Sequence, residues 1–120
     1  MISKQSSIND AAISIKEFID ANPLNKLSAT ELAAKFRVNR YKVLPIFKHL
    51  TGATIQHYKL KKCMEEAGNM LLSGMTVKEA AIECGYQEYH NNFTRSFKKV
   101  YTIGPEEWVK KNLIEKKNQL

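Results

Sequence analysis

The chain has 120 residues, 43% of them hydrophobic, which is enough for one domain or for two very small lobes that share a helix. Lysine and arginine outnumber aspartate and glutamate by 19 to 12, and the resulting net charge of +7 favours a polyanionic partner. No apolar run approaches the length of a membrane span and the N-terminus has no signal-peptide core, so we expect a cytoplasmic protein with no membrane partner.

The charge is unevenly distributed along the chain. Residues 35–62 contain basic residues and no acidic residue, and a second basic block begins at Arg95. Between the two blocks, glutamates dominate from Glu65 to Glu88. Two basic blocks separated by an acidic stretch suggest two contact surfaces, although a basic protein without a polyanionic partner has the same net charge.

The sequence contains no recognisable catalytic or metal-binding pattern. Cys63 and Cys84 lack a CxxC partner and a histidine at metal spacing, so we interpret them as buried free thiols of a reducing compartment. The three histidines are scattered, and there is no nucleophile motif or phosphate-cradling glycine-rich loop. We therefore expect neither an enzyme nor a bound cofactor or metal.

The first two helices are predicted by periodicity and by a cap. Apolar residues recur at helical spacing over residues 8–21, and Asn22-Pro23 ends that helix. Ser28 and Glu31 then form a capping box, in which each side chain satisfies a backbone N–H of the other residue's turn. The short helix that follows is expected to end near residues 37–38.

A third helix begins at the capping residue Asn39 and ends at Gly52, which we expect to be left-handed. A short helix, a tight polar turn and a second helix constitute a helix-turn-helix. We expect the inner face of the third helix to comprise Val43, Ile46, Phe47 and Leu50.

A long helix over residues 54–73 follows, and its length of about 30 Å suits a rigid connection. Gly68 weakens this helix by about 1 kcal/mol relative to alanine, which suggests either close packing at that point or flexibility.

The layout of the first helix-turn-helix then repeats. Thr76 and Glu79 form a second capping box, and Gly85 ends the short helix. After a polar turn, the next helix is expected to bury Phe93, Phe97, Val100 and Tyr101. Pro105 starts a final helix, and we expect Trp108 to dock it.

In a DNA-reading helix-turn-helix, the early residues of the second helix face base edges, while Lys, Arg and helix N-termini hold phosphates. Arginine can pair with guanine and asparagine with adenine, whereas any one of these residues alone is equally a solvated surface residue. The base-reading candidates are Arg40, Tyr41, Leu44, His90, Asn91, Thr94 and Arg95. The phosphate candidates are Asn39, Lys42, Lys48, Lys62, Asn92, Lys98 and Lys99.

These motifs resemble the DNA-binding domain of the AraC/XylS family of transcription regulators over nearly the whole chain. In the first lobe the resemblance is carried by Leu32-Ala33, Val43, Phe47-Lys48 and Gly52, and in the long helix by Tyr58, Ala67 and Leu71-Leu72. In the second lobe it is carried by Ala81, Gly85-Tyr86, Phe93-Thr94-Arg95-Ser96-Phe97-Lys98-Lys99, Pro105 and Trp108.

The resemblance implies an all-α fold of seven helices, with helix-turn-helix subdomains at residues 8–52 and 75–113 joined by a linker helix at residues 53–74. It implies that one chain reads two successive major-groove segments, about 34 Å apart. It also implies RNA polymerase as a second partner. We expect the domain to be monomeric by itself, and leave open whether it stands alone or belongs to a longer, dimeric regulator.

The sequence departs from the family pattern at four places. Leu44 and Pro45 stand at base-facing positions that are usually polar, and Pro45 removes a helical N–H, so we expect a kink there. The turn before Phe93 is one residue longer than usual. Cys63 replaces a common arginine, and Thr102 stands where glycine is usual.

The expected function is sequence-specific binding of double-stranded DNA that regulates transcription, with the second lobe making most of the hydrogen-bonded base contacts. The alternative is a helical module of the same fold that binds a protein partner and has only weak, non-specific affinity for DNA.

Overall fold

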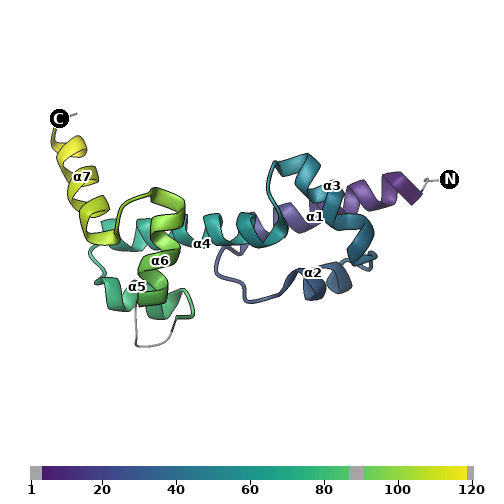
Figure 1. Cartoon of the computed structure of the whole chain (residues 1–120), viewed down its shortest axis with the longest axis horizontal. Coiled ribbons are helices and arrows are strands. Elements are labelled where there is room, and N and C mark those ends of the chain that lie inside the picture. The colour runs from purple at the N-terminus through teal and green to yellow at the C-terminus, as the bar shows by residue number, and fades with distance from the viewer. Residues whose placement is uncertain (1–3, 87–90, 119–120) are drawn as a thin grey trace. The chain divides into compact units, whose positions relative to one another are not determined.

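The computed structural model describes residues 4–86 and 91–118, which form helices joined by short loops (Figure 1). Over those ranges there are seven helices and no strand, which confirms the all-α prediction. None of these helices is long and apolar enough to cross a bilayer. The helices are α1 (Lys4–Ala21), α2 (Ala29–Lys35), α3 (Arg40–Thr51), α4 (Ile55–Leu72), α5 (Val77–Glu83), α6 (Asn91–Tyr101) and α7 (Pro105–Asn118).

The chain forms two compact units, Met1–Lys62 and Cys63–Leu120, here called the first and the second unit. Helix α4 begins in the first unit and ends in the second. The subdomain ranges expected from the sequence, 8–52, 53–74 and 75–113, treat α4 as a separate linker, and that division stays a prediction.

The first unit is built on a core between α1, α2 and α3, closed by the first residue of α4. Its core consists of Ala11, Ala12, Ile15, Ile19, Leu32, Ala33, Val43, Phe47 and Ile55. Residues four positions apart on α3, Val43 and Phe47, lie on the same face and are fully buried. Tyr58 of α4 packs edge-on against Phe47, with 5.4 Å between ring centroids.

One predicted core position of α3 is wrong, because Leu50 is 47% exposed. Leu50 lies beside Ile46 and the exposed Ile13 of α1 on a hollow of about 320 Å³. Asn9 and His49 complete the lining of this hollow, so the side chain of Leu50 borders an open depression and not the packed core. The helix itself continues through Pro45 to Thr51.

The second unit buries the last turns of α4 against α5 and α6. Its fully or almost fully buried residues are Met64, Ala67, Leu71, Ala80, Ala81, Phe93 and Phe97. Trp108 docks α7 as predicted, with its ring 5.5 Å from Phe97 and 5.0 Å from Tyr101. A Cβ on Gly68 would lie 2.7 Å from Cη2 of Trp108, so close packing explains the glycine in α4.

Both capping boxes form as predicted. The Ser28 hydroxyl accepts from the Glu31 N–H at 3.1 Å, and the Glu31 carboxylate accepts from the Ser28 N–H at 3.2 Å. Thr76 and Glu79 repeat this pair at 3.1 Å in both directions. The hydrogen bond from the Thr76 backbone holds the pKa of Glu79 below its usual value.

Candidate nucleic-acid interface

The first recognition helix, α3, starts with a side-chain cap. The Asn39 side-chain oxygen accepts from the Tyr41 N–H at 2.9 Å. This bond satisfies one of the free N–H groups of the first turn. Because the side-chain oxygen of Asn39 is used in the cap, its NH₂ group is the part available for the predicted phosphate contact. Lys42 and Lys48 are both exposed on the same helix, and α3 contains no acidic residue.

Arg40 is held by its own unit. Its Nη1 donates to the Thr30 hydroxyl at 2.8 Å, and its guanidinium lies 5.5 Å from the centre of the Tyr41 ring. Tyr41 is 78% exposed, which is unusual for such a large ring. The guanidinium therefore braces an aromatic side chain that projects into solvent.

A groove of about 480 Å³ lies beside α3. Its wall is formed by Arg40, Tyr41, Leu44, Pro45 and Lys48 of α3, by Ala29 of α2 and by residues 54–56 at the start of α4. The sequence indicated the α3 residues, because they follow a helix-turn-helix turn. It did not indicate Ala29 or residues 54–56, which join the groove only through the packing of three helices.

The second recognition helix, α6, is fixed from behind by aromatic residues. Phe93 and Phe97 are fully buried, and the Tyr86 hydroxyl donates to the Ser96 hydroxyl at 2.8 Å. Burial raises the pKa of Tyr86, with the bond to Ser96 opposing that shift, so the phenol stays protonated at neutral pH. These contacts fix which face of α6 is turned outward.

The outward face of α6 is basic and polar. Asn92, Arg95, Lys98 and Lys99 are exposed, and Thr94 is half-buried. The helix contains no acidic residue. Among the described residues, Arg95 has no hydrogen bond or ion pair. His90 and the side chain of Asn91, both predicted to read bases, lie outside the described residues.

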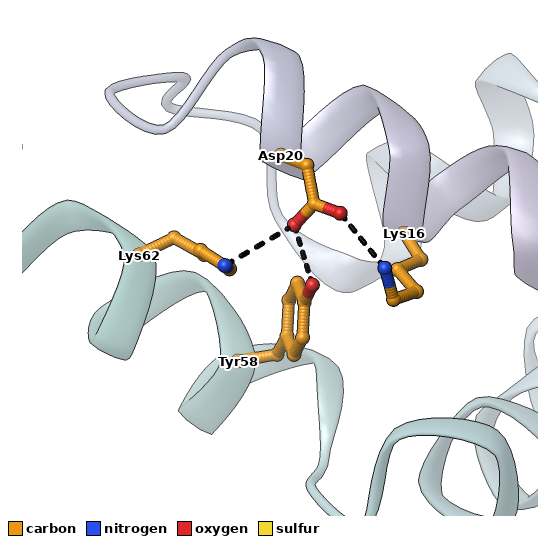
Figure 2. Close-up of polar contacts among 4 residues, drawn as sticks. All are labelled: Lys16, Asp20, Tyr58 and Lys62. Atoms are coloured by element: carbon orange, nitrogen blue, oxygen red, sulfur yellow. Dashed lines mark hydrogen bonds and ion pairs between the residues drawn. The ribbon is translucent and has the colours of Figure 1, made fainter. Parts of the chain in front are cut away.

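Lys62, a predicted phosphate contact, takes part in a polar network between α1 and α4 (Figure 2). Its Nζ lies 3.6 Å from Asp20 Oδ1, and Lys16 binds Oδ2 of the same carboxylate at 2.9 Å. The Tyr58 hydroxyl also donates to Asp20. Asp20 and Tyr58 are 38 positions apart, which is why no local pattern predicted their contact.

The network shifts the pKa of its carboxylate. Partial burial favours the protonated form of Asp20, but the hydrogen bonds from Tyr58 and Lys16 outweigh it and lower the pKa of Asp20. Burial and the neighbouring Asp20 together raise the pKa of Tyr58. Asp20 is therefore ionised at neutral pH and holds three donors on two helices.

Cys63 and Cys84 are free thiols, half-buried rather than fully buried as expected. The Cys84 thiol lies 3.9 Å from the carbonyl oxygen of Cys63. Its contact with Cys63, and then burial, raise the pKa of Cys84 well above its usual value. Within the described residues, no group of three or more His, Cys, Asp or Glu could hold a metal ion.

Comparison with known proteins identifies the family. The model of a helix-turn-helix domain matches residues 32–111, which is two thirds of the chain and includes both recognition helices. The chain belongs to the AraC-type helix-turn-helix family. AraC-type domains bind DNA in transcription regulators, so this chain is a DNA-binding regulator rather than an enzyme.

Solved structures of AraC-type domains share the fold. The C-terminal domain of the response regulator AraT from Geobacillus stearothermophilus superposes with a TM-score of 0.76 at 22% identity, over 84% of each chain. The C-terminal domain of the two-component response regulator yesN from Fusobacterium nucleatum gives 0.71 at 28% identity, over 83% of this chain and 98% of that one. A probable AraC family transcriptional regulator from Rhodopseudomonas palustris gives 0.70 at 23%, over 85% and 96%. No curated protein matches the sequence.

Proposed function

We propose that this AraC-type domain binds double-stranded DNA sequence-specifically in the major groove, with α6 as its principal reading helix. The observation that carries the proposal is the exposed Arg95, which has no partner among the described side chains and lies on a helix anchored through Phe93 and Phe97. A guanidinium that has no internal partner to leave can direct two of its N–H donors to guanine O6 and N7.

The neighbours of Arg95 suit the DNA backbone. Lys98, Lys99 and Asn92 are exposed on α6, and we assign them to phosphates on either side of the groove. Thr94 is half-buried at the edge of the same face and is assigned to a base. The base-reading roles of His90 and Asn91 stay predictions from the sequence.

In the first unit we assign Lys42 and Lys48 to phosphates, together with Asn39 through its side-chain NH₂ group. Arg40 already directs its Nη1 at Thr30, which restricts how its guanidinium can approach a base, so we expect it to contribute less specificity than Arg95. Lys62 remains a phosphate candidate, because its side chain is 30% exposed and its ion pair with Asp20 is long, at 3.6 Å.

The test is a selection of bound sequences from a pool of random duplexes, followed by salt titration on the selected site. We expect one enriched sequence and a decrease of log K with log salt of about 0.9 per phosphate contacted. Enrichment of two blocks would measure the predicted spacing of about one helical turn. If no duplex is enriched, the proposal of sequence-specific binding is wrong.

Arg95→Ala tests the assignment of the reading residue, with Lys110→Ala as its matched control. Lys110 is an exposed cation of α7 in the same unit, so both variants lose one positive charge. We expect Arg95→Ala to cost about 1–3 kcal/mol and to relax specificity at one base step. Equal weakening on every sequence would instead make Arg95 a phosphate contact.

One observation favours the alternative, a protein-binding module of the same fold. Ile13 and Leu50 are exposed large apolar residues on one hollow of the first unit, and such patches often mark protein contacts. RNA polymerase is the partner that the family resemblance suggests. Separately, we propose that the domain is monomeric by itself. Weak binding of all duplexes alike, together with loss of polymerase binding in Leu50→Ser, would support this alternative.

A further inference from the structure

The groove beside α3 differs chemically from an ordinary hydrogen-bonding reading surface. Tyr41, Leu44 and Pro45 present rings and aliphatic carbon to it, and Ala29 and Ile55 add further apolar wall. We propose that this groove makes the first unit selective for thymine, by receiving the 5-methyl group that only thymine carries into the major groove. The inference rests on the proposed major-groove binding and names the base class read by the first unit.

Apolar contact is the chemistry that distinguishes thymine from the other bases. In the major groove, thymine presents an acceptor oxygen and a methyl group, and side-chain carbon contacts the methyl. Leu44 and Pro45 have no side-chain hydrogen-bonding group, so they cannot pair with guanine or adenine. A methyl placed against them loses contact with water, which favours binding.

The arginine beside the groove is arranged to support this contact. Arg40 donates from Nη1 to Thr30, and its guanidinium lies 5.5 Å from the centre of the Tyr41 ring, so the guanidinium is held beside the ring and braces it. Tyr41 is 78% exposed in this braced position, which presents an aromatic surface before any DNA arrives. A pre-positioned side chain loses little conformational entropy on binding. Tyr41 is therefore the residue expected to contribute most to methyl recognition.

The charges around the groove are positive, which suits a polyanionic partner such as DNA. Arg40 and Lys48 lie in the groove wall and no acidic residue does. Lys42 is exposed on the same helix. These cations attract the sugar-phosphate backbone on each side, while the apolar wall faces the base edges between them.

The experiment removes the methyl group from the DNA and leaves the protein unchanged. Each thymine of the selected duplex is replaced in turn by deoxyuridine, which keeps the same hydrogen-bonding groups, and the dissociation constant is measured. We expect one or more thymines at which the loss of the methyl weakens binding about threefold to fivefold. A site without methyl-sensitive thymines would overturn the inference.

Variants then assign the sensitive methyl groups to the first unit. In Tyr41→Ser combined with Pro45→Ser, the preference for thymine over deoxyuridine at those positions should fall strongly, because two of the apolar contacts to the methyl are removed. Both side chains are exposed, so their replacement should leave the core intact. Lys42→Ala is the matched control, which should weaken all duplexes and keep the methyl preference. A methyl preference that survives undiminished in the double variant would contradict the assignment of methyl recognition to Tyr41 and Pro45.

The two proposals fail in different ways. If the random pool yields no preferred sequence, sequence-specific binding itself fails. If a preferred sequence is found and deoxyuridine is tolerated at every position, only thymine selection by the first unit fails.

Discussion

The two helix-turn-helix units of this chain share a backbone frame and differ in the surface built on it. In the first, the Val38 N–H donates to the Ala33 carbonyl at 3.0 Å, and in the second the Tyr86 N–H donates to the Ala81 carbonyl at 2.9 Å. Each frame begins with a capping box of the same geometry. The frame therefore requires only a cap, a small buried face and a left-handed turn residue.

The outer faces differ in how their arginines are used. Arg40 is bound to Thr30 and braces Tyr41, whereas Arg95 has no hydrogen bond within the described part of the chain. The first unit thus adds an apolar wall of Tyr41, Leu44 and Pro45 to its cations, whereas the exposed face of α6 in the second unit is basic and polar. The same frame supports two different exposed surfaces, because the buried face of each helix is independent of its exposed face.

Substitutions in the two cores test whether the two units unfold independently, and they should have the largest effects. Phe47 and Phe97 occupy matching positions and are both fully buried. Replacing either with alanine should lower the free energy of unfolding by about 3–5 kcal/mol, because a large cavity remains. The chain has one tryptophan, Trp108, and it packs on Phe97 in the second unit.

Denaturant titration followed by Trp108 fluorescence and by circular dichroism separates the two variants. We expect Phe97→Ala to move the fluorescence midpoint strongly and Phe47→Ala to move mainly the circular dichroism signal of the first unit. Equal shifts of the fluorescence midpoint in both variants would show that the units unfold as one cooperative structure.

The packing of α4 against α7 gives the next largest effect. Alanine at position 68 would improve helix propensity by about 1 kcal/mol, but its Cβ would meet the Trp108 ring at 2.7 Å. We expect Gly68→Ala to destabilise the second unit by about 1–3 kcal/mol, as overpacking does. In a Trp108→Leu background the same substitution should be neutral or stabilising. If Gly68→Ala still destabilises the protein there, contact with the Trp108 ring is not the cause.

The turns of the two units differ in strain. The left-handed position is filled by Arg37 at φ 54° in the first unit and by Gly85 at φ 90° in the second. A side chain in this region costs about 1–2 kcal/mol. Arg37→Gly should therefore stabilise the first unit by about 0.5–1 kcal/mol and Gly85→Ala should destabilise the second by about 1 kcal/mol. Thermal unfolding of the two variants measures whether each substitution raises or lowers the stability. A lower stability of Arg37→Gly would contradict the argument that Arg37 is strained.

The sequence predicted the frame well because its signals are local. Both capping boxes, the Asn39 cap and the left-handed Gly52 follow from residues within a few positions of one another. Thr102 is also left-handed, at φ 69°, and the resemblance had marked it only as a position where glycine is usual. The fold that the family resemblance implied is confirmed, and the assignment of reading helices stays a prediction.

The details of the candidate site depend on contacts between distant residues and were not predictable locally. The bond of Arg40 to Thr30 and the groove wall at residues 54–56 require the packed arrangement of α2, α3 and α4. The wrong prediction that Leu50 is buried has the same origin. Helical periodicity predicts which face of a helix points inward, but not how far other side chains cover that face.

The Asp20 network lies in the first unit, where one carboxylate joins α1 to α4. Asp20 has a lowered pKa in the folded chain, so its contribution to stability is present above its unfolded pKa of about 3.9. That contribution is lost as the pH falls through the folded-state value. We expect Asp20→Asn to destabilise the protein by about 0.5–1 kcal/mol at pH 7, since the network is largely exposed.

The pH dependence distinguishes this electrostatic effect from simple loss of packing. The difference in unfolding free energy between the natural sequence and Asp20→Asn should be constant from pH 7 to 5 and should disappear in acid, below the folded-state pKa of Asp20. Tyr58→Phe keeps the packing on Phe47 but removes the hydroxyl donor, so it should raise the pKa of Asp20 and shrink that difference. A difference that persists unchanged into acid would mean that the charge of Asp20 does not stabilise the first unit.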